Sequence, residues 1–297
     1  MEIHYLTKKA FAGILEGNPY VDKVHAIDAA VGEVLDELKK ENFDCIVDLH
    51  HNLRSMQVKR KLRVAHYSFH KLNYAKWLMV RLKINRLPAV HIVDRYMDTI
   101  KQLGVENDGM GLDFFIPASD EVNINDLPES FRKGYLGFVI GAAHVTKRLE
   151  TEKIISVCKK IGRPVVLLGG KEDMATASLI EAALGSMVYN ACGKYKLNQS
   201  ASLIRQAEEI VTHDTGLMHI AAAFQKPIVS VWGNTVPEFG MTPYLANRGG
   251  SEMVQVKGLS CRPCSKIGYS KCPRGHFKCM RDISEDELIS KIKLLAP

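Results

Sequence analysis

The second half of the chain alternates short apolar runs with longer segments in which apolar residues recur at helical spacing. The runs predict strands at residues 135–142, 164–168, 209–213 and 227–232, and the spacing predicts helices at 152–161, 175–184, 197–207, 217–224 and 284–295. The last helix starts with a capping box, Ser284 followed three residues later by Glu287. Such alternation of strands and helices is typical of a parallel sheet covered by helices.

The first half shows the same alternation less regularly. Its predicted strands are 2–6, 23–27 and 43–49, and its predicted helices are 34–40 and 91–103. Residues 105–134 contain Pro117, Pro128 and scattered acids, as in an interdomain connection. A chain of 297 residues is long enough for two domains. We therefore predict an α/β protein with domains at 1–125 and 126–297.

The composition indicates an ordinary globular protein, with 46% hydrophobic and 25% charged residues. No apolar run approaches the roughly 18 residues of a membrane-spanning helix. The first residues lack the pattern of a signal peptide, which favours a cytoplasmic location. The seven cysteines are odd in number, which argues against a disulfide framework. Cys45, Cys158 and Cys192 lie in apolar surroundings and are predicted to be buried.

Positive charge is concentrated between residues 49 and 93, where there is no Asp or Glu. The ten basic residues of this stretch are Arg54, Lys59, Arg60, Lys61, Arg63, Lys71, Lys76, Arg81, Lys83 and Arg86. A field of one sign attracts a phosphorylated substrate, an acidic lipid surface or nucleic acid. The alternative is a solvated basic face. The stretch has few aromatic residues and no recognition motif, which argues against nucleic acid.

The strongest chemical signal is the turn Asp214-Thr215-Gly216 between a predicted strand and a predicted helix. Parallel sheets bind ligands outside the carboxyl ends of their strands. The free N–H groups and the positive dipole end of a helix that starts there suit a phosphate. Gly216 allows close backbone approach, Thr215 offers a hydroxyl, and His219 lies one turn further on. The alternative is that Asp214 is a simple N-cap and His219 a satisfied helix histidine.

Two other strand ends add charges to the same edge of the predicted sheet. Lys147 follows the strand 135–142, after Ala142 and Ala143, and Asp173 follows the strand that ends before Gly169 and Gly170. A lysine, an acid and a helix N-terminus at one crevice outline a site for a nucleotide diphosphate.

These motifs resemble the heptosyltransferase family of bacterial glycosyltransferases (glycosyltransferase family 9, the ADP-heptose:lipopolysaccharide type). The matching run is Asp214-Thr215-Gly216-x-x-His219 with the alanines after it, Pro227 and the turn 233–235. Further similarity lies in the Lys147 segment, in residues 169–173 and 193–197, and in residues 18–22, 43–55 and 91–96 of the first half. The similarity covers nearly the whole chain.

The resemblance implies a GT-B fold, in which two Rossmann-like domains face each other across a cleft. It implies an inverting, metal-independent transfer of a heptose from an ADP-sugar to a lipid A–core acceptor. The implied donor-binding residues are Ala142, Ala143, Lys147, Asp173, Tyr195, Asp214, Thr215, Gly216 and His219. The N-terminal domain would hold the phosphorylated acceptor, for which Arg54, Lys59, Arg60 and Arg63 are candidates. We expect a monomer that contacts the anionic inner membrane peripherally.

The start of the chain departs from the family pattern. The family opens with a strand and a Gly-Asp loop whose Asp is the expected base, whereas Met1–Tyr5 resembles the second strand of the family. We therefore expect the first strand of the N-terminal sheet to be missing from this sequence. The catalytic base stays unassigned.

A second departure is a cysteine-rich loop, Cys261-x-x-Cys264-x7-Cys272-x6-Cys279. Four cysteines with one Cys-x-x-Cys pair are candidates for a structural zinc. Reduced thiols in a packed loop, and redox pairing, are the alternatives.

Two other functions fit the residues. One is a different GT-B activity, because the motif places a diphosphate without selecting the sugar. The other is a non-catalytic protein that binds nucleotide sugars.

Overall fold

The computed structural model describes residues 1–246 and 250–296. The chain forms two compact units: residues 1–73 with 89–109, and residues 74–88 with 110–297. The sequence had placed one boundary after residue 125. Residues 110–125 instead belong to the second unit, where the backbone N–H of Val122 donates to Ser202 Oγ at 3.0 Å. None of the described helices is both long and apolar enough to cross a bilayer.

The second unit contains a six-stranded sheet in which every pairing is parallel. The strands are β5 (Leu136–Val139), β6 (Val165–Leu168), β7 (Val188–Asn190), β8 (Glu209–His213), β9 (Ile228–Trp232) and β10 (Ser251–Gln255). Their order across the sheet is β10-β9-β8-β5-β6-β7. The chain thus builds outward from β5 in one direction and then restarts beside it with β8, which is the doubly wound Rossmann arrangement.

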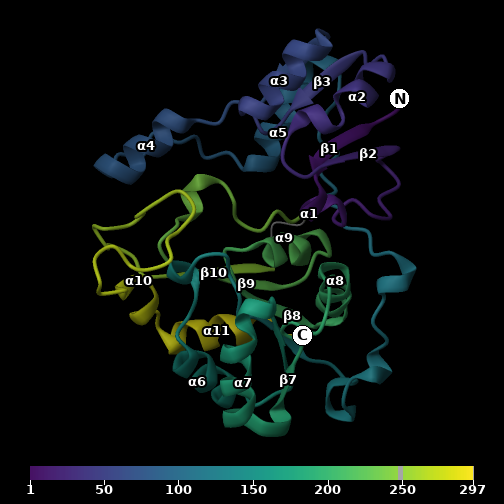
Figure 1. Cartoon of the computed structure of the whole chain (residues 1–297). Helices are drawn as coiled ribbons and strands as arrows, with labels where there is room; N and C mark the ends of the chain where they lie inside the picture. Colours follow the sequence, from purple (N-terminus) through teal and green to yellow (C-terminus); the bar gives the residue numbers. More distant parts are fainter. Residues whose placement is uncertain (247–249, 297) are drawn as a thin grey trace. The chain divides into compact units, whose positions relative to one another are not determined.

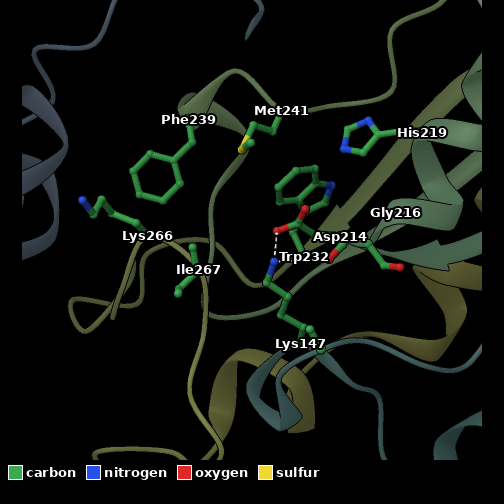
Figure 2. A pocket seen from close by; sticks show the side chains of 11 residues that line it. Lys147, Asp214, Gly216, His219, Trp232, Phe239, Met241, Lys266 and Ile267 are labelled. Carbon is green, nitrogen blue, oxygen red and sulfur yellow. Dashed lines mark hydrogen bonds and ion pairs between the residues drawn. The ribbon is translucent and has the colours of Figure 1, made fainter. Parts of the chain in front are cut away.

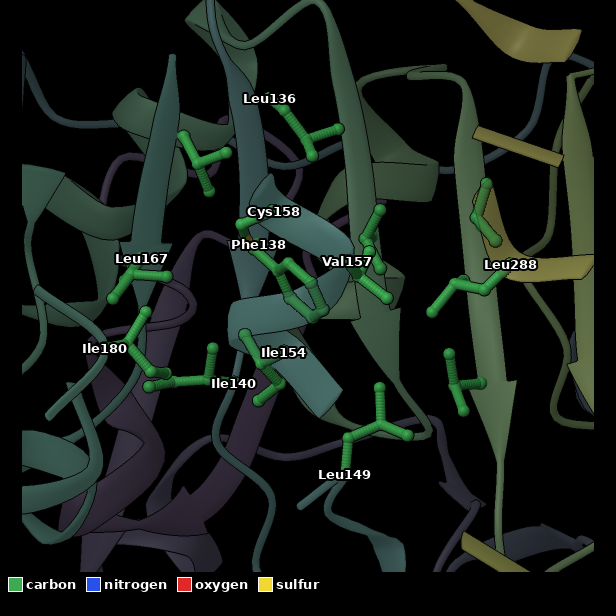
Figure 3. Packing of buried hydrophobic residues seen from close by; sticks show 14 of the residues in the cluster. Leu136, Phe138, Ile140, Leu149, Ile154, Val157, Cys158, Leu167, Ile180 and Leu288 are labelled. Carbon is green, nitrogen blue, oxygen red and sulfur yellow. The ribbon is translucent and has the colours of Figure 1, made fainter. Parts of the chain in front are cut away.

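Side chains of the central strands alternate between two cores, one on each face of the sheet. On one face, Leu136, Phe138 and Leu167 pack against helices α6 (Thr151–Ile161), α7 (Met174–Leu184) and α11 (Glu285–Leu295), as Figure 3 shows in part. On the other face, Val139 and Leu168 pack against α8 (Leu197–Gln206) and α9 (Gly216–Ala223). Figure 1 shows these helices around the sheet. Burial on both faces explains why these strands read as continuous apolar runs.

The sequence missed two strands of this sheet, β7 and β10. Strand β7 has only three residues. Strand β10 (SEMVQ) buries only Val254 completely and lies at the edge of the sheet. Short or half-buried edge strands lack the apolar run on which the prediction rests.

The first unit contains two separate two-stranded parallel sheets. One pairs β1 (His4–Lys8) with β2 (Lys23–Ile27), and the other pairs β3 (Cys45–Asp48) with β4 (Ala65–Ser68). The helices are α1 (Lys9–Ala12), α2 (Leu35–Lys40), α3 (Leu53–Leu62) and α5 (Ile92–Ile100). The core is small and centres on Ile27, Val31, Val34, Leu38 and Val58. The expectation of a missing first strand stays a prediction.

The basic stretch, residues 49–93, contains three elements that the sequence did not predict: α3, β4 and α4 (Asn73–Leu82). Met79 of α4 packs against Val236 and Phe239 of the second unit, which accounts for the assignment of residues 74–88 to that unit.

Candidate functional site

The candidate site lies where the order of the strands reverses. Strands β5 and β8 are neighbours, with Leu136 opposite Glu209 and Val139 opposite Thr212. The loops that leave their carboxyl ends therefore start side by side and diverge on opposite faces of the sheet, which leaves a crevice between them. The loop after β5 leads to Lys147, and the loop after β8 carries Asp214 and Thr215.

The N-terminus of α9 opens onto this crevice. Thr215, with φ −150° and ψ 167°, is the N-cap residue, and its side chain makes no capping hydrogen bond. Asp214 is therefore not the N-cap, contrary to the alternative considered from the sequence. An added Cβ at Gly216 would meet nothing within 4 Å, so the space beside the first turn is open. The first N–H groups of a helix seek an acceptor, and here an anionic ligand can supply it.

Lys147 and Asp214 form an ion pair in the crevice. Lys147 Nζ lies 2.7 Å from Asp214 Oδ2, and both side chains are largely buried, with 14% and 13% of their surface exposed. Thr235 Oγ1 also donates to Asp214 Oδ2, at 2.8 Å. The ammonium group is thus held in place beside the helix N-terminus, and an anion that enters must compete with Asp214 for it.

A cavity of about 270 Å³ lies against these residues. Its lining includes six of the predicted donor residues: Ala143, Lys147, Asp214, Thr215, Gly216 and His219. It also includes five residues that the sequence did not single out: Trp232, Phe239, Met241, Lys266 and Ile267. In Figure 2, His219 and Gly216 lie on one side of the Lys147–Asp214 pair, and Lys266 and Phe239 lie on the other. Charged groups, a histidine and apolar side chains thus share one pocket.

Lys266 reaches the cavity because its loop is fastened to the loop after β5. The Tyr269 N–H donates to Thr146 Oγ1 at 2.8 Å, and Thr146 Oγ1 and N–H both donate to the Tyr269 carbonyl. Gly268 has φ +127°, and an added Cβ would lie 2.5 Å from the Cβ of His144. Only glycine fits such a close approach at positive φ. The Lys-Ile-Gly sequence of this loop has no periodicity, so nothing in the sequence alone tied it to the site.

Three of the predicted donor residues lie outside the cavity lining. Ala142 is buried, and its carbonyl accepts hydrogen bonds from Arg148. Asp173 is buried; it accepts from the Gly170 N–H at 2.9 Å and pairs with Arg148 at 2.9 Å. Tyr195 contacts Tyr189 through their hydroxyls at 2.9 Å. The carboxylate of Asp173 therefore holds the loop after β6, and its predicted contact with a ribose stays untested.

His213 is a buried titratable residue next to the site that the sequence did not single out. It is the last residue of β8 and is fully buried, and its Nε2 accepts a hydrogen bond from the Leu149 N–H at 3.0 Å. Burial lowers the pKa of His213 to about 4. The imidazole is therefore neutral at physiological pH and fixes the chain that follows Lys147.

The four acceptor candidates share one element of the first unit: Arg54, Lys59 and Arg60 lie on α3, and Arg63 is its C-cap. Arg54, Arg60 and Arg63 are exposed. Lys59 is largely buried, and its Nζ lies 2.7 Å from Asp48 Oδ2 and 2.8 Å from Ser68 Oγ. Its charge is thus neutralised within the unit, whereas the three arginines present theirs to solvent.

The cysteines are all free thiols. Cys158 and Cys192 are buried as predicted, but Cys45 is only half-buried, because β3 belongs to a sheet of two strands with little cover. In the cysteine-rich loop, the proximity of Cys261 adds to burial in raising the pKa of Cys264. Within the described part of the chain, no three of the loop thiols lie within 4.8 Å of one another. The four thiols of the loop therefore lie further apart in this structure than the ligands of one ion.

Comparisons with known proteins agree with the geometry. The sequence profile of glycosyltransferase family 9 (heptosyltransferase) matches residues 31–270. Lipopolysaccharide heptosyltransferase 2 of Salmonella typhimurium is 34% identical over 180 residues, which is 58% of this chain and 49% of that protein. Lipopolysaccharide heptosyltransferase 1 of Campylobacter coli is 22% identical over 99% of this chain and 90% of its own length. The chain spans about half the length of the first of these relatives.

Solved structures share the fold. The structure of E. coli ADP-heptose lps heptosyltransferase II superposes with a TM-score of 0.72 at 20% identity, over 99% of this chain and 89% of that one. A glycosyltransferase family 9 protein from Veillonella parvula gives 0.73 at 22% identity, over 99% and 88%. The α/β fold of the GT-B class, expected from the resemblance, is confirmed.

Proposed function

Because the chain belongs to glycosyltransferase family 9 (heptosyltransferase), we propose that it transfers a heptose from an ADP-activated donor to a lipopolysaccharide core acceptor. One observation carries the proposal. Lys147, the N-terminus of α9 and Lys266 converge on one cavity at the switch point of a Rossmann-like sheet. This arrangement fits a diphosphate bearing a sugar.

The same residues account for departure of the leaving group. When the bond between the anomeric carbon and the diphosphate breaks, negative charge grows on the phosphate oxygens. Lys147 Nζ, Lys266 Nζ and the first N–H groups of α9 stabilise that charge, and His219 donates from one turn further along the helix. Asp214 contacts the sugar. This stabilisation needs no metal, and attack by the acceptor hydroxyl from the opposite side inverts the anomeric configuration.

The transferase proposal is tested by titrating ADP and ADP-heptose into the full chain in a calorimeter. Lys147→Ala and His219→Ala are expected to lower the affinity for both ligands. Lys159→Ala, which removes an exposed lysine from α6, is the control that leaves affinity unchanged. Titrating UDP- and GDP-sugars in the same way shows which nucleobase of the donor the site prefers. Equal affinity for all three nucleotides, or equal effects of Lys147→Ala and Lys159→Ala, would refute the proposed donor site.

We also propose that the protein works as a monomer at the cytoplasmic face of the inner membrane, where the acceptor lies. Three exposed arginines of the first unit, Arg54, Arg60 and Arg63, suit acceptor phosphates. The exposed, stacked rings of Tyr74 and Trp77 on α4, with centroids 6.2 Å apart, suit the headgroup region of a bilayer. Sedimentation with anionic and with neutral vesicles tests this contact. Trp77→Ala should reduce binding, whereas Tyr20→Ala, an exposed ring of the first unit, should not.

A structural zinc at the cysteine-rich loop stays a proposal. Its support is the Cys-x-x-Cys pair and the proximity of Cys261, Cys272 and Cys279 to Cys264. Metal analysis of the purified protein and of Cys261→Ser tests it. Zinc that is retained by the variant would exclude this loop as the site.

A further inference from the structure

We propose that His4, His25 and Glu41 of the first unit bind a divalent transition-metal ion of the zinc type. The three side chains come from β1, from β2 and from the residue that follows α2. One ligand atom from each lies within 4.8 Å of the other two. Neither the donor site nor the cysteine-rich loop contributes to this cluster.

Strand register explains why the two histidines meet. In the parallel pair of β1 and β2, His4 stands opposite Lys23 and Leu6 opposite His25. His4 and His25 are therefore diagonal neighbours on the same face of the sheet. His4 Nδ1 lies 3.0 Å from His25 Nε2. Two ligands of a tetrahedral zinc ion, each about 2.05 Å from the metal, are about 3.3 Å apart, so the imidazoles need to separate only slightly.

The outer nitrogen of each imidazole faces a carboxylate. His4 Nε2 lies 2.7 Å from Glu2 Oε1. His25 Nδ1 lies 3.0 Å from Glu37 Oε1, although without the alignment of a hydrogen bond. Histidines that ligate metals commonly donate their second N–H to a carboxylate, which orients the ring and raises its basicity. In the absence of metal, the pair of inner nitrogens can share only one proton; a metal ion would take both lone pairs and let both outer N–H groups donate.

The surroundings of the cluster suit a bound ion. The side chain of His25 is fully buried, that of His4 is 6% exposed, and that of Glu41 is 23% exposed, so the ion would be reached from the side of Glu41. The ring of Phe43 packs edge-on to His4 with centroids 5.1 Å apart, which limits rotation of that imidazole.

Lys23 pairs with the carboxylate of Glu41 and would compete with a metal ion for it. Its Nζ lies 2.5 Å from Glu41 Oε1 and 3.0 Å from Glu37 Oε1. An incoming metal must displace the ammonium from Glu41. Two imidazoles and a carboxylate select zinc and its neighbours over Mg²⁺ and Ca²⁺, which prefer oxygen ligands alone. The ion would tie both strands to the end of α2 and so reinforce a sheet of only two strands.

The test is a zinc titration of the full chain against a chromophoric chelator. His4→Ala and Glu41→Gln should lower the affinity for zinc at this site by about tenfold or more. His66→Ala, which removes an exposed histidine from β4, should change nothing. Lys23→Met should strengthen zinc binding because it removes the competing charge; a purely structural histidine pair does not predict this gain. Mg²⁺ should not compete.

Cobalt distinguishes this site from the cysteine-rich loop. Co²⁺ bound by imidazole and carboxylate gives only weak visible bands, whereas thiolate ligands add intense charge-transfer absorption in the near ultraviolet. The proposal expects the weak bands to disappear in His4→Ala and to persist in Cys261→Ser. It is overturned if the metal signal has thiolate character alone, if it survives in His4→Ala, or if Lys23→Met does not bind zinc more tightly.

Discussion

The ion pair of Lys147 and Asp214 makes a quantitative prediction for donor binding. Replacing Lys147 with Met keeps most of the aliphatic stem but removes the charge next to the N-terminus of α9. A hydrogen bond to a charged group contributes about 1.5–3 kcal/mol. Since about 1.4 kcal/mol corresponds to a factor of ten, ADP should bind about 10- to 150-fold more weakly to Lys147→Met.

Asp214 adds a second effect, because its carboxylate is left unpaired beside the incoming phosphates. Thr235 still donates to Asp214 Oδ2, so the carboxylate stays in place when the lysine is lost. The double variant Lys147→Met/Asp214→Asn removes this repulsion and should bind ADP more tightly than Lys147→Met alone. Residues in direct contact couple by about 0.5–3 kcal/mol.

The assay is calorimetric titration of ADP into the wild type, both single variants and the double variant, with circular dichroism to confirm that each is folded. Asp214→Asn alone should bind ADP at least as tightly as the wild type, because in this variant no ion pair between Lys147 and Asp214 has to break before Lys147 contacts the phosphates. A loss of less than about threefold in Lys147→Met, or a double variant no better than Lys147→Met, would contradict the placement of the diphosphate at this ion pair.

Three further predictions concern the surroundings of the cavity. Lys266→Ala should lower the affinity for ADP by about two- to fivefold, which is less than the effect of Lys147→Met. This loss should shrink in high salt because Lys266 is exposed. An effect as large as that of Lys147→Met in the same titration would argue against this ranking. Gly268→Ala places a Cβ against His144 at positive φ and should destabilise the fold by about 1–3 kcal/mol in urea unfolding. The control is Gly32→Ala, where a Cβ meets nothing within 4 Å. Equal stability of the two variants would show that the loop is not held as described. The pKa of His213 lies below its ordinary value, so its contribution to stability is complete above about pH 6.5 and is lost as the pH falls toward 4. This loss is worth roughly 3 kcal/mol. Between about pH 6.5 and 4, the wild type should therefore lose about that much more unfolding free energy than His213→Gln, and an equal loss in the two proteins would contradict this prediction.

Local sequence signals predicted where the turn and the lysine that line the cavity lie. The Asp214-Thr215-Gly216 turn, the helix after it and the lysine after β5 all lie where the pattern of apolar runs placed them. The prediction worked because strands buried on both faces read as continuous apolar runs and because the carboxyl ends of parallel strands share one edge.

Other residues of the site could not be assigned from the sequence. Lys266 enters the cavity through a loop held by Thr146 and Gly268, and Phe239 enters through a short turn. Asp173 follows a strand as expected, yet it turns inward to Arg148 and to the Gly170 N–H instead of lining the cavity. Strand ends show where a side chain starts, but its partner is set by loops distant in sequence.

The sequence by itself determined the alternation of strands and helices, the position of the Asp214-Thr215-Gly216 turn and the family, since each depends on residues close together in the chain. Only the tertiary structure decided that β8 pairs with β5, that Lys59 is neutralised by Asp48, and that His4, His25 and Glu41 meet. Those outcomes depend on strand order and register. Both are fixed by burial of whole faces and by pairing across distant segments, and no local pattern of residues records them.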